Sequence, residues 1–145
     1  MKYPALNEIF RLKIDGDLLG NSPFSMVRAS DHQPNDWRYV GNFIRGIQER
    51  EFRLVNTNTV VINIGEARKA LAMVHTITTC ESQWLWAFQL QFPIYDHNGP
   101  IGFADPAWID PHGNIRFPCI NTDGRLGFFP SHLMLYNFWR FLVPV

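Results

Sequence analysis

The chain has 145 residues, with 13 basic and 13 acidic side chains and a formal net charge of zero at pH 7. Its length fits a single domain, residues 1–145, that can bury a real hydrophobic core. The balanced charge argues against a nucleic-acid binder and against a protein that docks on an anionic membrane.

The N-terminal residues 1–8 lack the apolar run of a secretory signal, and no stretch holds the about 18 uninterrupted apolar residues of a membrane span. We therefore expect an intracellular protein located in the cytoplasm. The 2 cysteines, Cys80 and Cys119, are too few for a disulfide framework. In a reducing compartment, we expect both to be buried free thiols.

Residues 8–19 begin with a period of two, in which Phe10, Leu12 and Ile14 alternate with basic residues. Such alternation predicts a strand. The Asp15-Gly16 pair that follows is a strong hairpin signal, because both residues tolerate a positive φ. A helix that begins at Asn7 is the weaker alternative.

Residues 20–36 are rich in glycine, proline and asparagine and are expected to form a loop, with room for a short strand at 24–29. The next segment, after a capping residue at Asn35 or Asp36, repeats apolar residues every three or four positions, at Trp37, Val40, Ile44 and Ile47. This spacing predicts a helix to about Arg50. Two glycines in it each weaken a helix interior by about 1 kcal/mol and argue for close packing or against the helix.

Residues 52–64 return to β character with a polar break at 56–58, which predicts two short strands joined by a tight turn. Residues 65–74 are rich in helix formers and predict a helix. Its apolar face is expected to hold Ala67, Ala70, Leu71 and Val74. The β-branched residues 76–80 lead towards the next element.

The stretch 83–95 has a large apolar side chain at every even position. A strand sends alternate side chains to opposite faces, and at roughly 3.3 Å per residue this one would be about 40 Å long. We therefore predict a long central strand that is bent or shared between two packing surfaces. One face of this strand would carry Trp84, Trp86, Phe88, Leu90, Phe92 and Ile94.

Three similar units follow, at residues 96–103, 110–117 and 121–128. In each unit a glycine precedes Ile or Leu by two residues and Phe by four. This pattern predicts an antiparallel meander that turns at its glycines. A last helix, residues 133–142, is expected between Pro130 and Pro144.

Together these segments predict an α+β domain, in which a strongly bent antiparallel sheet of six to eight strands is packed on one face by two or three helices. Segments in which apolar and polar residues alternate outnumber the three segments with helical character, and this favours a domain dominated by a sheet.

His97 and His112 occupy equivalent places in two turn units, beside Asp96 and Asp110. Adjacent hairpin ends would bring these four residues together as an acid–base cluster of a small hydrolase or lyase. The alternative is that histidine and aspartate lie at turn tips because they tolerate turn conformations and solvent. The spacing matches no zinc site, so no metal is predicted.

Two other catalytic arrangements have weaker support. Asp105 and Asp110 flank an expected exposed Trp108, a combination that fits sugar chemistry, although Asp-Pro at strand ends is the simpler interpretation. Cys80, with His75 nearby in the sequence, and Cys119 are candidate nucleophiles, but a cysteine in a β-rich stretch is far more often a small core residue. The sequence has no phosphate-binding loop or nucleophile elbow, and no cofactor is expected.

Aromatic residues make up 14% of the chain, and their surplus favours a non-enzymatic binding module. The predicted pocket lies between the bent sheet and its helices and would take an apolar or cationic small molecule. The alternative is that the aromatic face is simply core. The residues expected to line the pocket are Trp84, Trp86, Phe88, Phe92 and Trp108.

The C-terminal segment 133–145 is so apolar that we also expect a two-fold homodimer, held through this segment and an adjoining sheet edge. In the alternative, the predicted helix is covered within the monomer. A protein that acts through such an apolar C-terminal surface is a further functional alternative.

Overall fold

The computed structural model describes residues 3–19, 38–39, 44–57, 61–75, 81–92, 99–102, 108–130, 132–136 and 139–145. The elements of the N-terminal half are β1 (Phe10–Asp15), α1 (Gly16–Leu19), β2 (Arg38–Tyr39), β3 (Ile47–Val55), β4 (Val61–Ile62) and α2 (Ile64–Val74). The remaining elements are α3 (Gln83–Gln91), β5 (Ile101–Gly102), β6 (Trp108–Ile109), β7 (Ile115–Ile120), β8 (Leu126–Pro130), β9 (Leu135–Tyr136) and β10 (Arg140–Pro144).

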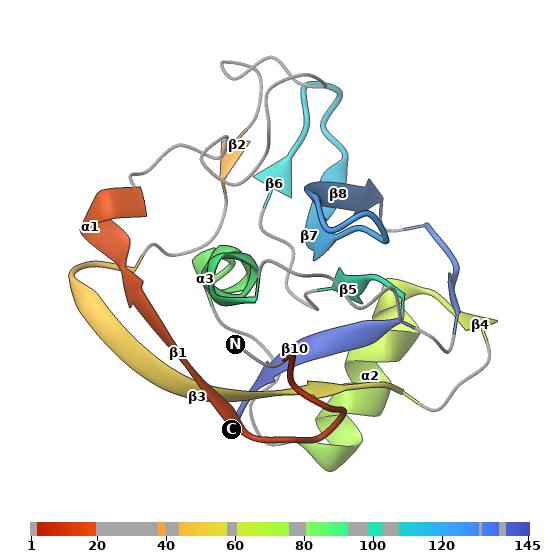
Figure 1. Cartoon of the computed structure of the whole chain (residues 1–145). Coiled ribbons are helices and arrows are strands. Elements are labelled where there is room, and N and C mark those ends of the chain that lie inside the picture. Colours follow the sequence, from red (N-terminus) through yellow and green to blue (C-terminus); the bar gives the residue numbers. More distant parts are fainter. Residues whose placement is uncertain are drawn as a thin grey trace.

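One large sheet of 8 strands dominates the described part of the chain, in the order β1-β3-β10-β5-β7-β6-β2, with β8 paired to β7. Its pairs are antiparallel except that of β10 with β5. Strands β4 and β9 form a separate antiparallel pair. The large sheet curves strongly, as Figure 1 shows.

Helix α3 lies inside this curve, where Figure 1 views it almost end-on. Its buried residues share a core with side chains of β1, β3, β5, β7 and β10. The described members of this inner core are Leu12, Ile14, Ile44, Phe52, Leu54, Trp84, Leu85, Ala87, Phe88, Phe92, Ile101, Ile120 and Leu142.

Helix α2 packs on the other side of β3 and β10, over a second core. Asn63 caps it, since its side-chain oxygen accepts the Glu66 backbone N–H at 2.9 Å. The predicted helix at 65–74 is thus confirmed. Of its predicted apolar face, Ala67 and Leu71 are buried, whereas Val74 is 78% exposed.

The predicted central strand at 83–95 is wrong for residues 83–91, which form α3. Alternation of apolar and polar residues occurs here by coincidence, and residues 83–92 contain no β-branched side chain. Glutamine, leucine and alanine are all good helix formers. Because the sheet surrounds α3, most of its circumference is apolar, and the period of 3.6 disappears from the sequence.

The strand at Phe10–Asp15 is confirmed, but the hairpin at Asp15-Gly16 is wrong. Gly16 begins α1, and β1 pairs instead with β3, Phe10 opposite Phe52. The predicted helix at 36–50 is also wrong where it is described, because Arg38–Tyr39 and Ile47–Val55 are strands. Gly46 has φ 66°, which interrupts a helix.

The two strands predicted within 52–64 are present as the end of β3 and as β4, but they belong to different sheets. The possible strand at 24–29 and residues 76–80 lie outside the described residues, as do residues 58–60 of the predicted turn.

The predicted C-terminal helix at 133–142 is wrong: this part of the chain contains β9 and β10. Strand β10 lies between β3 and β5, with Phe141 and Val143 in the α2-side core and Leu142 in the inner core. A strand buried on both faces is apolar throughout, and its sequence resembles that of a buried helix.

The glycine turns of the second and third repeated units are confirmed, whereas residues 96–98 of the first unit lie outside the described residues. Gly99, Gly113 and Gly124 all have positive φ, at 99°, 82° and 82°. The second and third turns each join neighbouring antiparallel strands, β6 to β7 and β7 to β8. The meander is incomplete, because β5 pairs with β7 and β10. With its bent, mostly antiparallel sheet and helices, the chain has the predicted α+β fold.

Candidate functional site

One side of α3 carries a row of three residues, Gln83, Trp86 and Leu90, which is covered at one end and exposed at the other. They are spaced by three and four positions, so they lie one above another on one side of the helix. Burial decreases along the row: Gln83 is buried, Trp86 is partly buried and Leu90 is 62% exposed. We call these three residues the α3 stripe.

Gln83 is the polar end of the α3 stripe and is only 3% exposed. Its Oε1 accepts the backbone N–H of Ile44 at 2.6 Å. Its Nε2 is buried and finds no hydrogen-bond partner in the described part of the chain. A buried donor without an acceptor costs about 1–3 kcal/mol, so an orphaned amide beside a half-covered indole is a candidate ligand contact.

The opposite side of α3 holds three of the residues predicted to bind a ligand. Trp84, Phe88 and Phe92 are 1%, 1% and 6% exposed and pack into the inner core. The Phe88 and Phe92 ring centroids are 4.9 Å apart, and those of Phe52 and Trp84 are 5.1 Å apart. This packing favours the alternative that these aromatic residues are core, whereas Trp86 retains an accessible surface.

Trp108 was expected to be exposed, and this is wrong: it is 1% exposed. Its ring centroid lies 5.9 Å from that of Phe128 in an edge-to-face contact. Asp105, the other carboxylate of the suggested sugar site, lies outside the described residues. A buried indole offers no stacking surface to a sugar.

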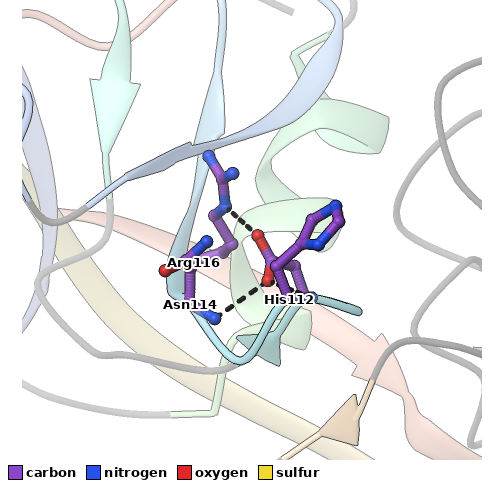
Figure 2. Close-up of polar contacts among 4 residues, drawn as sticks. His112, Asn114 and Arg116 are labelled. Atoms are coloured by element: carbon purple, nitrogen blue, oxygen red, sulfur yellow. Dashed lines mark hydrogen bonds and ion pairs between the residues drawn. The ribbon is translucent and has the colours of Figure 1, made fainter.

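Asp110 is 5% exposed and organises the turn before β7 (Figure 2). Its Oδ1 accepts the backbone N–H groups of His112 and Asn114, each at 2.9 Å. Its Oδ2 accepts the Arg116 Nε–H, also at 2.9 Å. Burial alone raises the pKa of Asp110, but the Asn114 N–H, Arg116 and the His112 N–H together hold it below its ordinary value.

His112 is exposed, and its contact with Asp110 is through the backbone N–H. Its imidazole therefore does not form an acid–base pair with the Asp110 carboxylate. Asp96 and His97, the other two residues of the predicted catalytic cluster, lie outside the described residues. Their convergence with Asp110 and His112 remains a prediction.

Cys119 is a buried free cysteine, as predicted, whereas Cys80 lies outside the described residues. Burial raises the pKa of the Cys119 thiol to about 12, and its Sγ contacts Asn121 Oδ1 at 3.3 Å. A thiol that stays protonated at neutral pH is a poor nucleophile.

The described residues contain no group of three or more His, Cys, Asp or Glu side chains that could hold a metal ion. Among the helices of this part of the chain, none is both long and apolar enough to cross a membrane.

Two members of the α3 stripe were not among the residues predicted to bind a ligand. Gln83 was not singled out, and Leu90 was predicted only as part of the apolar face of the strand. The absence of β-branched residues in 83–92 was the available signal. With a helix assigned there, Gln83 falls on the same side as Trp86.

Comparison of the chain with known protein families, curated proteins and solved structures found no match.

Proposed function

We propose that the protein is a non-enzymatic binding module for a small, mostly apolar molecule that carries a hydrogen-bond acceptor. The ligand would lie along the α3 stripe, with its apolar part against Trp86 and Leu90 and its acceptor at Gln83 Nε2. Gln83 Nε2, which finds no partner among the described residues, carries this proposal, because a ligand carbonyl or hydroxyl oxygen would satisfy the buried donor.

The Trp86 indole also suits a cationic ligand, through the attraction of a cation to an aromatic face. Gln83 Nε2 separates the two chemistries, since a cation without an acceptor leaves this N–H group unsatisfied. A neutral ligand that bears an acceptor therefore fits the α3 stripe better than a cation does. The hydrolase or lyase alternative gains no support from Asp110, whose two oxygens already accept three hydrogen bonds within its own turn.

A thermal-shift screen with matched pairs of compounds tests the proposal. Each pair shares one apolar skeleton, and only one member has a carbonyl or hydroxyl oxygen. A compound at 100 times its dissociation constant adds about 2.7 kcal/mol of stability. Acceptor-bearing members should stabilise the protein and change its tryptophan fluorescence, whereas their hydrocarbon and cationic counterparts should have weaker effects.

Three variants locate the binding. Gln83→Leu removes the donor and should weaken binding roughly fivefold, the value of one net hydrogen bond. Trp86→Ala should reduce both affinity and the fluorescence change. Met73→Ser is the control, since Met73 is an 86% exposed apolar residue of α2. No stabiliser in a broad set of compounds, or full binding by Gln83→Leu, would refute the proposal.

The expected homodimer can use only part of the predicted segment 133–145, because Phe141, Leu142 and Val143 are buried within the subunit. Among the described residues of this segment, the exposed apolar ones are Val145 at the end of the chain and a group of three, Leu133, Met134 and Tyr136, around β9. We propose the group of three around β9 as the dimer contact. Light scattering at micromolar concentration should give a dimer mass that Met134→Glu reduces to a monomer mass, and a monomeric wild type would refute the dimer.

A further inference from the structure

Two side-chain hydrogen bonds hold α3, and with it the α3 stripe, in a fixed orientation. Gln89 Nε2 donates to Gly124 O in the turn between β7 and β8 at 2.9 Å. Gln91 Nε2 donates to Arg11 O of β1, also at 2.9 Å. At 3.6 residues per turn, these two glutamines leave the helix about 100° to either side of Leu90. The exposed end of the stripe therefore lies between two fixed tethers.

The buried end of the stripe favours a carbonyl oxygen over other acceptors. Gln83 is the first residue of α3, at the positive end of the helix dipole. Its Oε1 already accepts the Ile44 N–H at 2.6 Å, whereas its Nε2 finds no partner among the described residues. A carbonyl oxygen can accept from this amide without adding a donor. A hydroxyl is less suitable, because it brings a donor of its own to a place where the amide oxygen is already engaged.

A charged head group fits this end poorly. Residues 83–91 contain no charged side chain, and Gln83 is only 3% exposed. The basic residue next to Ile44 in the sequence, Arg45, is exposed to solvent. Because a buried carboxylate without a paired cation is costly, a neutral carbonyl group suits this end best.

The spacing of the stripe limits the length of the ligand. Leu90 follows Gln83 by seven positions, and at 1.5 Å per residue the stripe is about 10 Å long. An extended chain gains about 1.2 Å per bond, so roughly eight bonds span this distance. Because burial decreases from Gln83 to Leu90, the polar head belongs at the covered end and the end of the chain near solvent.

We propose that the ligand is a neutral, linear carbonyl compound, such as a ketone or an ester, with its carbonyl near one end and a tail of roughly eight carbons. This inference rests on the proposed function and adds the head group, length and orientation of the ligand. The carbonyl oxygen accepts from Gln83 Nε2, and the tail lies on Trp86 and ends at Leu90. Methylenes on the stripe leave water, whereas those beyond Leu90 stay in water and add little affinity.

A series of methyl ketones from five to thirteen carbons tests the length. The wild-type protein is titrated with each ketone, and binding is followed by tryptophan fluorescence and by calorimetry. The dissociation constant should fall about threefold per added carbon up to roughly ten carbons and then level off. A dissociation constant that keeps falling to thirteen carbons, or that does not change with length, would overturn the inference.

Compounds of ten carbons test the head group and its orientation. At neutral pH the methyl ketone should bind at least fivefold more tightly than the alcohol, the carboxylate and the ketone with a central carbonyl. Equal affinity of the two ketones would overturn the orientation, and a carboxylate or alcohol that binds as well would overturn the head group. In those cases the proposed function still stands. If no acceptor-bearing compound binds, the proposed function fails and this inference fails with it.

Two variants separate the two ends of the stripe. Gln83→Glu keeps an acceptor for the Ile44 N–H but has no amide donor, so it should weaken five-carbon and ten-carbon methyl ketones alike, at least fivefold. Leu90→Ala should leave the five-carbon ketone within twofold of wild type and weaken the ten-carbon ketone at least threefold. If Gln83→Glu does not fold, Gln83→Met removes the same donor with a side chain of similar shape. Wild-type affinity of either end's variant for the ten-carbon ketone would overturn the inference.

Discussion

The Arg116 Nε–H donates to Asp110 Oδ2 at 2.9 Å and ties the start of β7 to the turn before it. The Arg125–Asp123 pair in the next turn has a separation of 3.6 Å, with side chains that are 77% and 57% exposed. The two turns come from similar sequences, but only the first buries its carboxylate. Asp123 occupies the position of His112 in the first turn, so the two aspartates compare a buried carboxylate with an exposed one at different turn positions.

Asp110→Ala should destabilise the protein by about 1–3 kcal/mol, because it leaves two backbone N–H groups and the Arg116 side chain without their acceptor. Asp123→Ala should cost less than about 1 kcal/mol, as is usual for an exposed ion pair. Urea unfolding of the two variants measures both values. Equal losses would mean that the contacts of the buried Asp110 stabilise the protein no more than the exposed Asp123 pair does.

The Asp110 carboxylate should also produce a pH dependence of stability. Its folded pKa is held below its ordinary value, so its contribution is present above the unfolded pKa of about 3.9 and is lost as the pH falls through the folded pKa. The difference in unfolding free energy between wild type and Asp110→Asn should be constant from about pH 7 to pH 5. It should shrink below about pH 4, and a difference that grows there would contradict the argument.

The buried Cys119 thiol should resist alkylation in the native protein. Burial raises its pKa to about 12, so the reactive thiolate is scarce at pH 8, and the side chain is also covered. Iodoacetamide at pH 8 followed by peptide mass spectrometry should find Cys119 unmodified in the native protein and modified in urea. Rapid native labelling would place this thiol at the surface.

Gly113 should be required for its backbone angle and not for space. A Cβ at this position meets nothing within 4 Å, but φ is 82°. Gly113→Ala should therefore cost about 1–2 kcal/mol, and Gly113→Asn less, because asparagine tolerates the left-handed conformation. Thermal unfolding measures the order of the two variants, and an alanine variant as stable as wild type would contradict the strain argument.

Phe141 should behave as a core residue of the isolated subunit. It is 1% exposed within β10, so Phe141→Ala should cost about 3–5 kcal/mol at any protein concentration. Tyr136→Ala, at a position that is 52% exposed, should change the stability of the subunit by less than about 0.5 kcal/mol. A loss for Phe141→Ala that depends on protein concentration would instead place this residue in an interface.

Local chemistry alone determined several parts of this fold. Gly113 and Gly124 could be assigned to turns because the turn conformation needs a positive φ. The helix at Ile64–Val74 follows from its helix formers and from the capping residue before it. Strand β1 follows from alternation, because one of its faces is solvated and the other is buried.

Tertiary structure decided the elements that are covered on most sides. Residues 83–91 and 140–144 are both largely apolar, yet the first segment is a helix inside the curved sheet and the second is a strand within it. A helix and a strand show different periods only when one face meets water. Where neighbouring elements cover nearly the whole surface, the choice depends on partners distant in the chain, such as β3 and β5 for β10. The buried Gln83 Nε2, which finds no partner among the described residues, has the same origin, because only the packed structure determines which polar groups lose their water.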